Sequence, residues 1–313
     1  MIGMPGKSYR GPLPPLTEAE QALARTLRAD VEELAGQIGD RNVLTRPRQL
    51  EQAAEMLEAA LREAGFSVER QPIQVQERTC FNLIASLPGS GRADEVVVVG
   101  GHYDSVVGCP AANDNGSGTA ATLALARSFA GRQSAGQAGR TLRFLFFVNE
   151  EPPFFQTPLM GSLVYARRCQ ERRDDVRAML SLETIGYYDD AAGSQQYPAA
   201  ALGMLYPSSG DFVSFVGDRP SRRLVRDVVR SFRAHTQFPS QGASLPASIP
   251  GVGFSDHWSF WEAGYPGVMV TDTAMFRYPY YHTPEDTPDK VDFERLARVV
   301  AGLERVVGGL SQG

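Results

Sequence analysis

The chain has 313 residues, 42% of them hydrophobic and 21% charged, which is close to ordinary globular composition and excludes a disordered, collagenous or coiled-coil protein. Its length is compatible with one large α/β domain or with two smaller domains. The formal net charge of −5 and the lack of any run of basic residues argue against nucleic acid as the main partner.

The N-terminal part of the chain predicts an extended arm followed by two amphipathic helices. Residues 1–15 are rich in glycine and proline. Thr17 and Glu20 have the spacing of a capping box, and apolar residues then recur at steps of three and four up to Ile38. A second helix is expected over residues 48–64, where the apolar residues again share one face.

Two kinds of strand follow these helices. Residues 67–75 alternate between polar and apolar, as a half-exposed strand does, and residues 79–87 are its expected neighbour. Four further runs are short, almost continuously apolar and rich in Val, Leu and Phe, which is typical of strands covered on both faces. These runs are EVVVVGG (95–101), TLRFLFFVN (141–149), AMLSLET (178–184) and PGVMVTD (266–272).

Helical stretches lie between and after the four buried runs. They cover residues 116–132, 161–173, 221–235 and 293–310. Strands that alternate with helices indicate an α/β fold, here a three-layer sandwich with a mostly parallel central sheet flanked by helices. We expect residues 1–45 to form an arm and a helix that pack on a single α/β domain over residues 46–313.

Each buried run is followed by an acid or a histidine. In chain order these residues are His102 and Asp104, Glu150 and Glu151, Glu183, and Asp272. Because ligands of open α/β sheets bind outside the carboxyl ends of the strands, we expect these side chains to gather at one edge of the sheet. Two adjacent carboxylates after an apolar run are costly to bury unless a cation or hydrogen bonds compensate, which favours a cation site there.

Two loop residues complete a candidate metal centre. Asp114 lies in the turn-rich segment GCPAANDNGSG just before a helix, where capping of that helix is the alternative role. His282 lies in a Tyr- and Pro-rich loop before the last helix, where the alternative is a packed loop histidine. The resulting set of two imidazoles and three carboxylates suits a pair of zinc ions. Its members are His102, Asp114, Glu151, Glu183 and His282.

Six short motifs resemble those of the M28 family of zinc-dependent peptidases. In chain order they are G-H-Y-D-S, A-N-D-N-G-S-G, N-E-E, S-L-E-T-I-G, S-D-H and Y-H-T-x-x-D-T. The resemblance extends from about Cys80 to the C-terminus and implies the zinc-peptidase-like phosphorylase/hydrolase fold. Because typical members are co-catalytic aminopeptidases, it also implies an exopeptidase with peptide substrates and two zinc ions per chain.

The resemblance implies a role for each candidate ligand. Asp114 resembles the carboxylate that bridges the two metals, and the peptide bond after it is often cis in the family. His102 and Glu183 would complete one metal site, and Glu151 and His282 the other. Many members of the family have aspartate at the position of Glu183.

Further residues are candidates for catalysis and substrate binding. Glu150 resembles the general base, and Asp104 resembles the acid that hydrogen-bonds a ligand histidine and fixes its tautomer. Tyr281 and His257 are candidate hydrogen-bond donors to the oxyanion of the transition state. Arg277 is a candidate ligand for a substrate carboxylate, which would indicate a carboxypeptidase-like or dipeptide substrate.

Aromatic residues near the motifs could line an apolar pocket that favours a hydrophobic first residue, or they could be ordinary core. They are Phe154, Phe155, Trp258, Trp261 and Phe276. Two departures from the family pattern bear on the shape of such a pocket. Asn149 stands where glycine is common, and the segment PPFFQTP (152–158) replaces a shorter turn.

Two alternatives to an aminopeptidase belong to the same fold. Glutaminyl cyclases use a single zinc for an intramolecular acyl transfer, so metal stoichiometry discriminates them. Some relatives are non-catalytic receptors or scaffolds that have lost ligands, whereas this chain retains all five candidate ligands and Glu150. A serine hydrolase is disfavoured because no G-x-S-x-G motif occurs.

Cysteine content and apolar runs bear on the compartment. Three scattered cysteines, without a C-x-x-C pair, exclude a disulfide framework. The sequence has no uncharged apolar run of membrane-spanning length, and its N-terminus has no apolar segment of signal-peptide length. We therefore expect a soluble chain that is cytoplasmic or, if a signal was removed, secreted or periplasmic.

Overall fold

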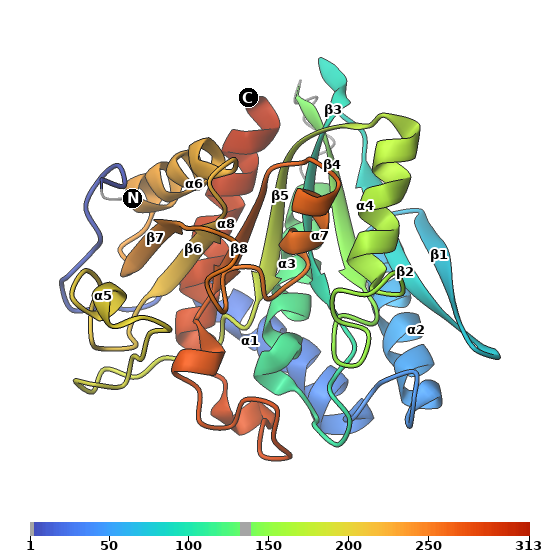
Figure 1. The fold of residues 1–313 in the computed structure, drawn as a ribbon, viewed down its shortest axis with the longest axis horizontal. Helices are drawn as coiled ribbons and strands as arrows, with labels where there is room; N and C mark the ends of the chain where they lie inside the picture. Colours follow the sequence, from blue (N-terminus) through green and yellow to red (C-terminus); the bar gives the residue numbers. More distant parts are fainter. Residues whose placement is uncertain (1–2, 132–138) are drawn as a thin grey trace.

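The computed structural model, which describes residues 3–131 and 139–313, is organised around an eight-stranded mixed sheet (Figure 1). The strand order is β1-β2-β4-β3-β5-β8-β6-β7. The strands are β1 (Val68–Val75), β2 (Arg78–Leu87), β3 (Arg92–His102), β4 (Arg140–Phe147), β5 (Asp175–Glu183), β6 (Val213–Gly217), β7 (Ser240–Ser244) and β8 (Gly267–Thr271). The central strands β4, β3, β5 and β8 run parallel, whereas β1–β2, β2–β4 and β6–β8 pair antiparallel.

Helices cover both faces of this sheet, which confirms the predicted three-layer α/β fold (Figure 1). One core contains side chains of α1, α2, α3, α6 and α8, and the opposite core contains side chains of α4 and α7. The helices are α1 (Glu18–Val31), α2 (Pro47–Glu63), α3 (Gly118–Ala130), α4 (Gly161–Arg172), α5 (Ala200–Gly203), α6 (Arg222–His235), α7 (His257–Glu262) and α8 (Phe293–Gln312).

The continuous apolar run of β3 follows from burial on both faces. Val97 and Val99 belong to the core beneath α3 and α8, whereas Val96 and Val98 belong to the core beneath α4 and α7. Successive side chains of a strand point to opposite faces, so a strand between two helical layers has no solvent-facing position for a polar residue.

The N-terminal helix begins with the predicted capping box. The main-chain N–H of Thr17 donates to Glu20 Oε2 at 2.8 Å, and the N–H of Glu20 donates to Thr17 Oγ1 at 3.2 Å. The helix continues as a π-helical turn, η1 (Glu32–Ile38). It packs against α8 and α3, and Arg127 of α3 forms an ion pair with Asp30 at 2.6 Å.

The structure also departs from the sequence-based expectations. Strands β6 and β7 were not predicted, since they are short and β7 is mostly polar. The helix expected over residues 116–132 begins only at Gly118, because η2 (Ala112–Ser117) contains non-helical residues at Asp114 and Asn115. Residue 132 lies outside the described residues.

None of the helices within residues 3–131 and 139–313 combines the length and apolarity needed to cross a membrane. The parallel strands β3, β4, β5 and β8 all direct their carboxyl ends to the same edge of the sheet. The acids and histidines that follow these strands are therefore attached to the main chain at neighbouring positions along this edge.

Candidate metal centre and adjoining pocket

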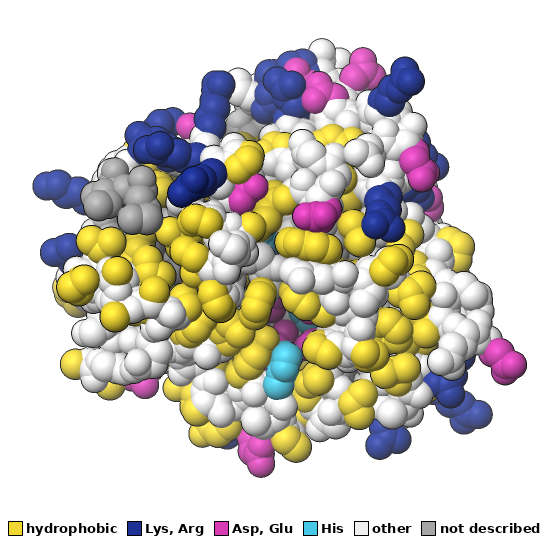
Figure 2. Space-filling view, in the orientation of Figure 1, with side chains coloured by type: hydrophobic (Ala, Val, Ile, Leu, Met, Phe, Trp, Pro, Cys, Tyr) yellow, Lys and Arg dark blue, Asp and Glu magenta, His cyan; other side chains and the backbone are white. Residues whose placement is uncertain are grey.

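All five predicted ligands come together at the carboxyl edge of the sheet. They are His102 at the end of β3, Asp114 in η2, Glu151 after β4, Glu183 at the end of β5, and His282 in the loop before α8. A space-filling view shows a hollow bordered by hydrophobic side chains, with acidic side chains inside it and a histidine at its edge (Figure 2).

Asp114 lies between the two imidazoles. Its Oδ1 is 3.4 Å from His102 Nε2, and its Oδ2 is 3.0 Å from His282 Nε2. Glu183 Oε2 lies 3.3 Å from His102 Nε2, and Glu151 Oε2 lies 3.3 Å from His282 Nε2. The ligand atoms therefore form two groups that share Asp114, each with its atoms within 4.8 Å of one another. The peptide bond between Asp114 and Asn115 is cis, as the family resemblance implies.

Glu150 lies at the border of this cluster. Its Oε2 is 3.8 Å from His102 Nε2, and together with His102 and Glu151 it forms a third group of possible ligands. Burial raises the pKa of Glu150 well above its ordinary value, and the charges of neighbouring carboxylates such as Glu183 add to this shift, although His102 opposes it.

The donor set fits a cation. The Nε2 atom of His102 and the Oε1 atom of Glu151 are buried and have no hydrogen-bond partner among the described residues. Burial and the charges of Asp114 and Glu150 raise the pKa of Glu151 well above its ordinary value. Buried nitrogen and oxygen atoms that face one another without an intervening proton donor are suited to zinc, which binds both kinds of atom.

Burial disfavours the ionised form of Asp114, but its contacts with His102 and His282 outweigh this effect and lower its pKa. The carboxylate that the two groups share is therefore the acid of this cluster that ionises most readily. Both of its oxygens are then able to act as ligands at neutral pH.

Asp104 holds the main chain that carries the two glutamates. Its carboxylate accepts hydrogen bonds from the N–H groups of Glu150 at 3.2 Å and Glu151 at 3.3 Å. The predicted hydrogen bond from a ligand histidine to this carboxylate does not form, since His102 Nδ1 is 3.6 Å from Asp104 Oδ1. His102 Nδ1 instead donates to the main-chain carbonyl of Asp104 at 3.1 Å. This bond directs Nε2 toward the acids.

Two aspartates position the Asp114 segment, a role that was not predicted for them from the sequence. The carboxylate of Asp286 accepts the N–H groups of Asn113 at 2.8 Å and Asp114 at 3.0 Å. Asp272, which was expected to join the acids at the sheet edge, accepts the side-chain amide of Asn113 at 2.9 Å and lies outside the ligand groups. The signal for Asp286 was its place in the Y-H-T-x-x-D-T motif.

Asn149 explains one of the departures from the family pattern. Its φ is 59°, in the left-handed region where glycine is favoured and asparagine is tolerated. Its side-chain amide donates to Cys80 Sγ at 3.2 Å and to the carbonyl of Leu159 at 3.3 Å. The residue therefore keeps the backbone conformation of the glycine that is common at this position.

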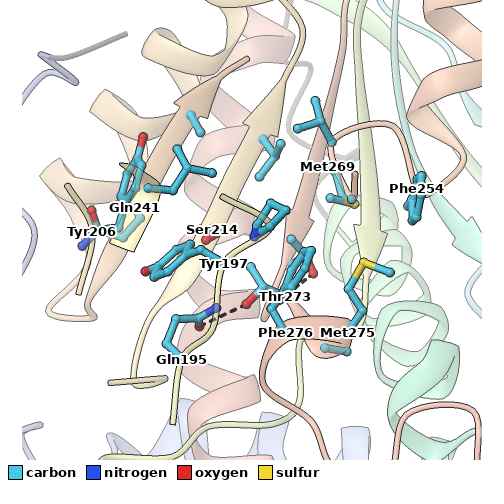
Figure 3. A pocket seen from close by; sticks show the side chains of 18 of the residues that line it. Gln195, Tyr197, Tyr206, Ser214, Gln241, Phe254, Met269, Thr273, Met275 and Phe276 are labelled. Carbon is cyan, nitrogen blue, oxygen red and sulfur yellow. Dashed lines mark hydrogen bonds between the residues drawn. The ribbon is translucent and has the colours of Figure 1, made fainter. Parts of the chain in front are cut away.

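An apolar pocket adjoins the metal centre, and residues such as Phe254, Met269 and Phe276 line it (Figure 3). Glu183 and Tyr281 also belong to its wall. Its empty space, including the open mouth, is about 810 Å³. Glu183 is the only charged side chain among the described residues that line it. Apolar lining residues include Phe212, Val216, Leu245, Phe254, Met269, Met275 and Phe276.

The aromatic residues expected to line a pocket are mostly placed elsewhere. Phe276 lines the pocket, whereas Phe154, Trp258 and Trp261 do not. Phe155 does not line it either, but its ring packs edge-on against the lining residue Phe254, with the ring centroids 5.8 Å apart. Of the two roles that the sequence left open for these residues, pocket lining therefore holds for Phe276, because the pocket walls come largely from β6, β7 and the loop after β8 rather than from residues 152–158 and α7.

The three candidate substrate contacts have different surroundings. Tyr281 lines the pocket, and its ring stacks on His282 with the ring centroids 3.9 Å apart. His257 is fully buried, and its Nε2 donates to the carbonyl of Val252 at 2.8 Å. The Arg277 guanidinium donates to Gln195 Oε1 at 2.9 Å and to a main-chain carbonyl. The structure therefore brings Tyr281 to the site and places His257 and Arg277 behind the pocket wall.

Comparisons with known proteins agree with this geometry. The model of peptidase family M28 matches residues 82–307. The chain is 35% identical over 263 residues to the uncharacterized protein YfbL of Escherichia coli, a match that covers 81% of this chain and 78% of YfbL. It is 27% identical over 235 residues to leucine aminopeptidase 1 of Arthroderma otae, covering 71% of this chain and 56% of that protein, so it spans about half of the fungal relative's length.

A solved structure shares the fold. The structure of BSAP, a zinc aminopeptidase from Bacillus subtilis, aligns with a TM-score of 0.71 at 16% identity, and the alignment covers 93% of this chain and 95% of that one. At this level of identity the likeness concerns the fold, and the chemistry has to be argued from the site itself.

Proposed function

Because the chain belongs to peptidase family M28 and is a metallopeptidase, we propose that it is an aminopeptidase with two zinc ions and a glutamate general base. The observation that carries the proposal is the place of Asp114, whose two oxygens face His102 Nε2 and His282 Nε2 at 3.4 and 3.0 Å. A carboxylate in this position can serve as a ligand common to two neighbouring cations.

In this proposal one zinc ion is held by His102, Asp114 and Glu183, and the other by Asp114, Glu151 and His282. Bound there, zinc supplies the Lewis acidity that lowers the pKa of water and polarises the scissile carbonyl. The protein residues supply the proton transfer, the orientation of the substrate and its selection.

Glu150 moves the proton. Its carboxylate is next to the ligand groups, and its main-chain N–H is held by Asp104 at 3.2 Å. A carboxylate fixed in this way takes the proton of the attacking water and delivers it to the leaving amine. The adjacent Glu151 faces His282 at 3.3 Å, which suits a ligand rather than a base.

Tyr281 donates a hydrogen bond to the carbonyl oxygen that becomes negative. Burial and the charges of Asp114 and Glu151 raise the pKa of Tyr281, so its phenol stays protonated and remains a donor. Its ring is held against His282, at the border between the metal centre and the pocket. A donor at this border is able to stabilise the developing charge.

The pocket accepts the side chain of the first residue of the peptide. Its lining is almost free of charged groups. An apolar side chain can therefore be removed from water there without taking the place of an ion. The carboxylates of the metal centre are able to attract the free amino terminus. We therefore propose peptides and aminoacyl amides with a large apolar first residue as substrates.

The test combines metal analysis with a panel of substrates. We expect two zinc ions per chain, hydrolysis of leucine amide, and no hydrolysis of its N-acetylated form. One zinc ion per chain and formation of pyroglutamyl peptide from a glutaminyl peptide would identify a cyclase instead. Metal binding without turnover of any member of the panel would contradict an enzymatic role.

A further inference from the structure

One buried arginine lies behind the metal centre and outside the motifs. Arg41 is in the connection between η1 and α2, whereas the family match begins at residue 82. Its side chain is 0% exposed. A guanidinium removed from water is costly unless its N–H groups find acceptors, so its partners identify what this residue does.

Three hydrogen bonds of the Arg41 guanidinium end on one loop. Its Nε donates to the carbonyl of Tyr103 at 2.6 Å, its Nη1 to that of Pro110 at 2.6 Å, and its Nη2 to that of Ala111 at 3.1 Å. Two further bonds from Nη1 reach the carbonyls of Gly39 at 3.1 Å and Leu34 at 3.5 Å, outside this loop. Within the described residues, all acceptors of the guanidinium are main-chain carbonyls.

This loop, residues 103–111, connects two proposed ligands. Tyr103 directly follows His102, and Ala111 is three residues before Asp114. The main chain of Arg41 reinforces the connection, because its N–H donates to Ser105 Oγ at 3.0 Å and its carbonyl accepts the N–H of Ser105 at 2.9 Å. Both ends of the loop are thus attached to one planar group with a fixed donor geometry.

We propose that Arg41 is a positioning residue of the metal centre, which fixes His102 and Asp114 relative to each other by holding the two ends of the loop between them. The inference rests on the proposed metal sites. The residue touches neither substrate nor ligand atoms, and it acts through the carbonyls of Tyr103, Pro110 and Ala111.

The charge of Arg41 serves the same purpose. Burial lowers its pKa to about 10, and the nearby Asp104, Asp286 and Asp114 act in the opposite direction, so the guanidinium remains charged at neutral pH. A cation behind the loop offsets part of the repulsion among the acids of the centre. The charge of Arg41 acts on these acids through space, because its guanidinium donates hydrogen bonds only to main-chain carbonyls.

Two substitutions separate the geometry from the charge. Arg41→Lys keeps the charge but lacks the fork that reaches both ends of the loop, and Arg41→Met removes both. Outer-shell partners of metal ligands typically contribute about 10- to 100-fold in affinity, so we expect a loss in this range for zinc in Arg41→Lys and a larger loss in Arg41→Met. The affinity is measured on the folded chain by competition with a chelator, without reference to turnover.

The matched control is Arg143→Met. Arg143 is partly buried, and it pairs with Asp174 and Tyr165 rather than with any residue of the ligand groups. We expect this variant to lower the melting temperature and to keep the zinc affinity of the unchanged chain. Arg41→Lys should instead lower zinc affinity even when both variants lose the same thermal stability.

The outcomes are distinct. If the Arg41 variants lose stability as Arg143→Met does but bind zinc as tightly as the unchanged chain, Arg41 only supports the fold and the inference is overturned. If Arg41→Met does not fold, the zinc affinity of Arg41→Lys decides alone. An unchanged chain that binds no zinc would overturn the proposed function and this inference together.

Discussion

The metal centre contains several poorly exposed carboxylates and the ion-pair network between α2 and β1 contains one, Glu58, but the charges of the two groups are balanced differently. In the network, Arg70 contacts Glu51 at 2.5 Å and Glu58 at 2.8 Å, and Arg62 contacts Glu58 at 2.7 Å. In the metal centre the carboxylates face two histidines and one another, and two polar atoms have no hydrogen-bond partner among the described residues.

This difference teaches how to distinguish a structural group of charges from a functional one. A group whose carboxylates all have guanidinium partners is complete as it stands, and its contribution is to the stability of the fold. A buried group with more acids than bases is stable only when something else binds to it. Four predictions follow this distinction, and the first two concern the incomplete group.

Asp114→Asn should have the largest effect. The substitution weakens the ligand that the two groups share, so we expect the zinc content to fall at both sites and turnover to be lost. Metal analysis and turnover of leucine amide on the same preparation provide the measurement. Full metal content with a full rate would mean that Asp114 only caps the following helix.

Glu150→Gln should keep both metals and the fold but lower the rate. The amide is nearly isosteric with the carboxylate but does not accept the proton, and loss of a general base typically costs about 100- to 10,000-fold. The effect should fall on kcat more than on KM, since substrate binding is left in place. Glu151→Gln is the matched control and should lose metal; the opposite pattern would reverse the roles of the two glutamates.

His257 allows the comparison to be extended to a buried histidine that faces no acid group of the centre. Burial lowers its pKa from 6.5 to about 4, so the unfolded chain binds a proton in this pH range that the folded chain does not. The stability that this residue contributes is present above pH 6.5 and is lost as the pH falls toward 4.

The corresponding variant is His257→Asn, which does not titrate. Between pH 7 and 4 the free energy of unfolding of the unchanged chain should decrease by more than that of the variant, with a difference of at most about 3 kcal/mol. Urea unfolding at several pH values measures both curves. Parallel curves would show that this histidine does not titrate differently in the folded chain.

Arg70→Met should have the smallest effect, because it breaks the complete group. The substitution leaves Glu58 with Arg62 as its remaining guanidinium partner, and for a partly exposed pair we expect a loss of about 1–2 kcal/mol in the free energy of unfolding. Zinc affinity and kcat should not change. A loss of metal in this variant would remove the distinction between the two groups of charges.

The sequence was sufficient to predict the layers of the fold and the gathering of the candidate ligands at one edge of the sheet. The run from Val96 to Val99 has no polar position, which is the pattern of a strand between two helical layers. In the structure its side chains do belong to the cores on both faces of the sheet. Because these strands are parallel, the acids that follow such runs lie at the same edge of the sheet. This is why Glu151 and Glu183 were found without any knowledge of the tertiary structure.

The pocket and the supporting residues could not be predicted in the same way. Strand β7 is only five residues long and contains Ser240, Gln241 and Gly242, so its pairing with β6 depends on tertiary contacts rather than on its own pattern. Arg41 lies in a connection between helices, where an arginine is usually solvated. Its burial depends on carbonyls more than 60 residues away in sequence, which no local pattern records.

The pocket is encoded in different segments from the metal centre. Its walls come largely from residues 195–276, between β5 and the loop after β8, whereas four of the five proposed ligands lie on other segments and Glu183 stands at the border. The selectivity of the proposed pocket for a side chain and the reactivity of the proposed metal centre can therefore diversify separately. Exchange of the lining side chains between homologues should change which side chain the proposed pocket accepts and leave the proposed ligands in place, provided that Asp272 and Ser255, which contact Asn113 and Glu183, are kept.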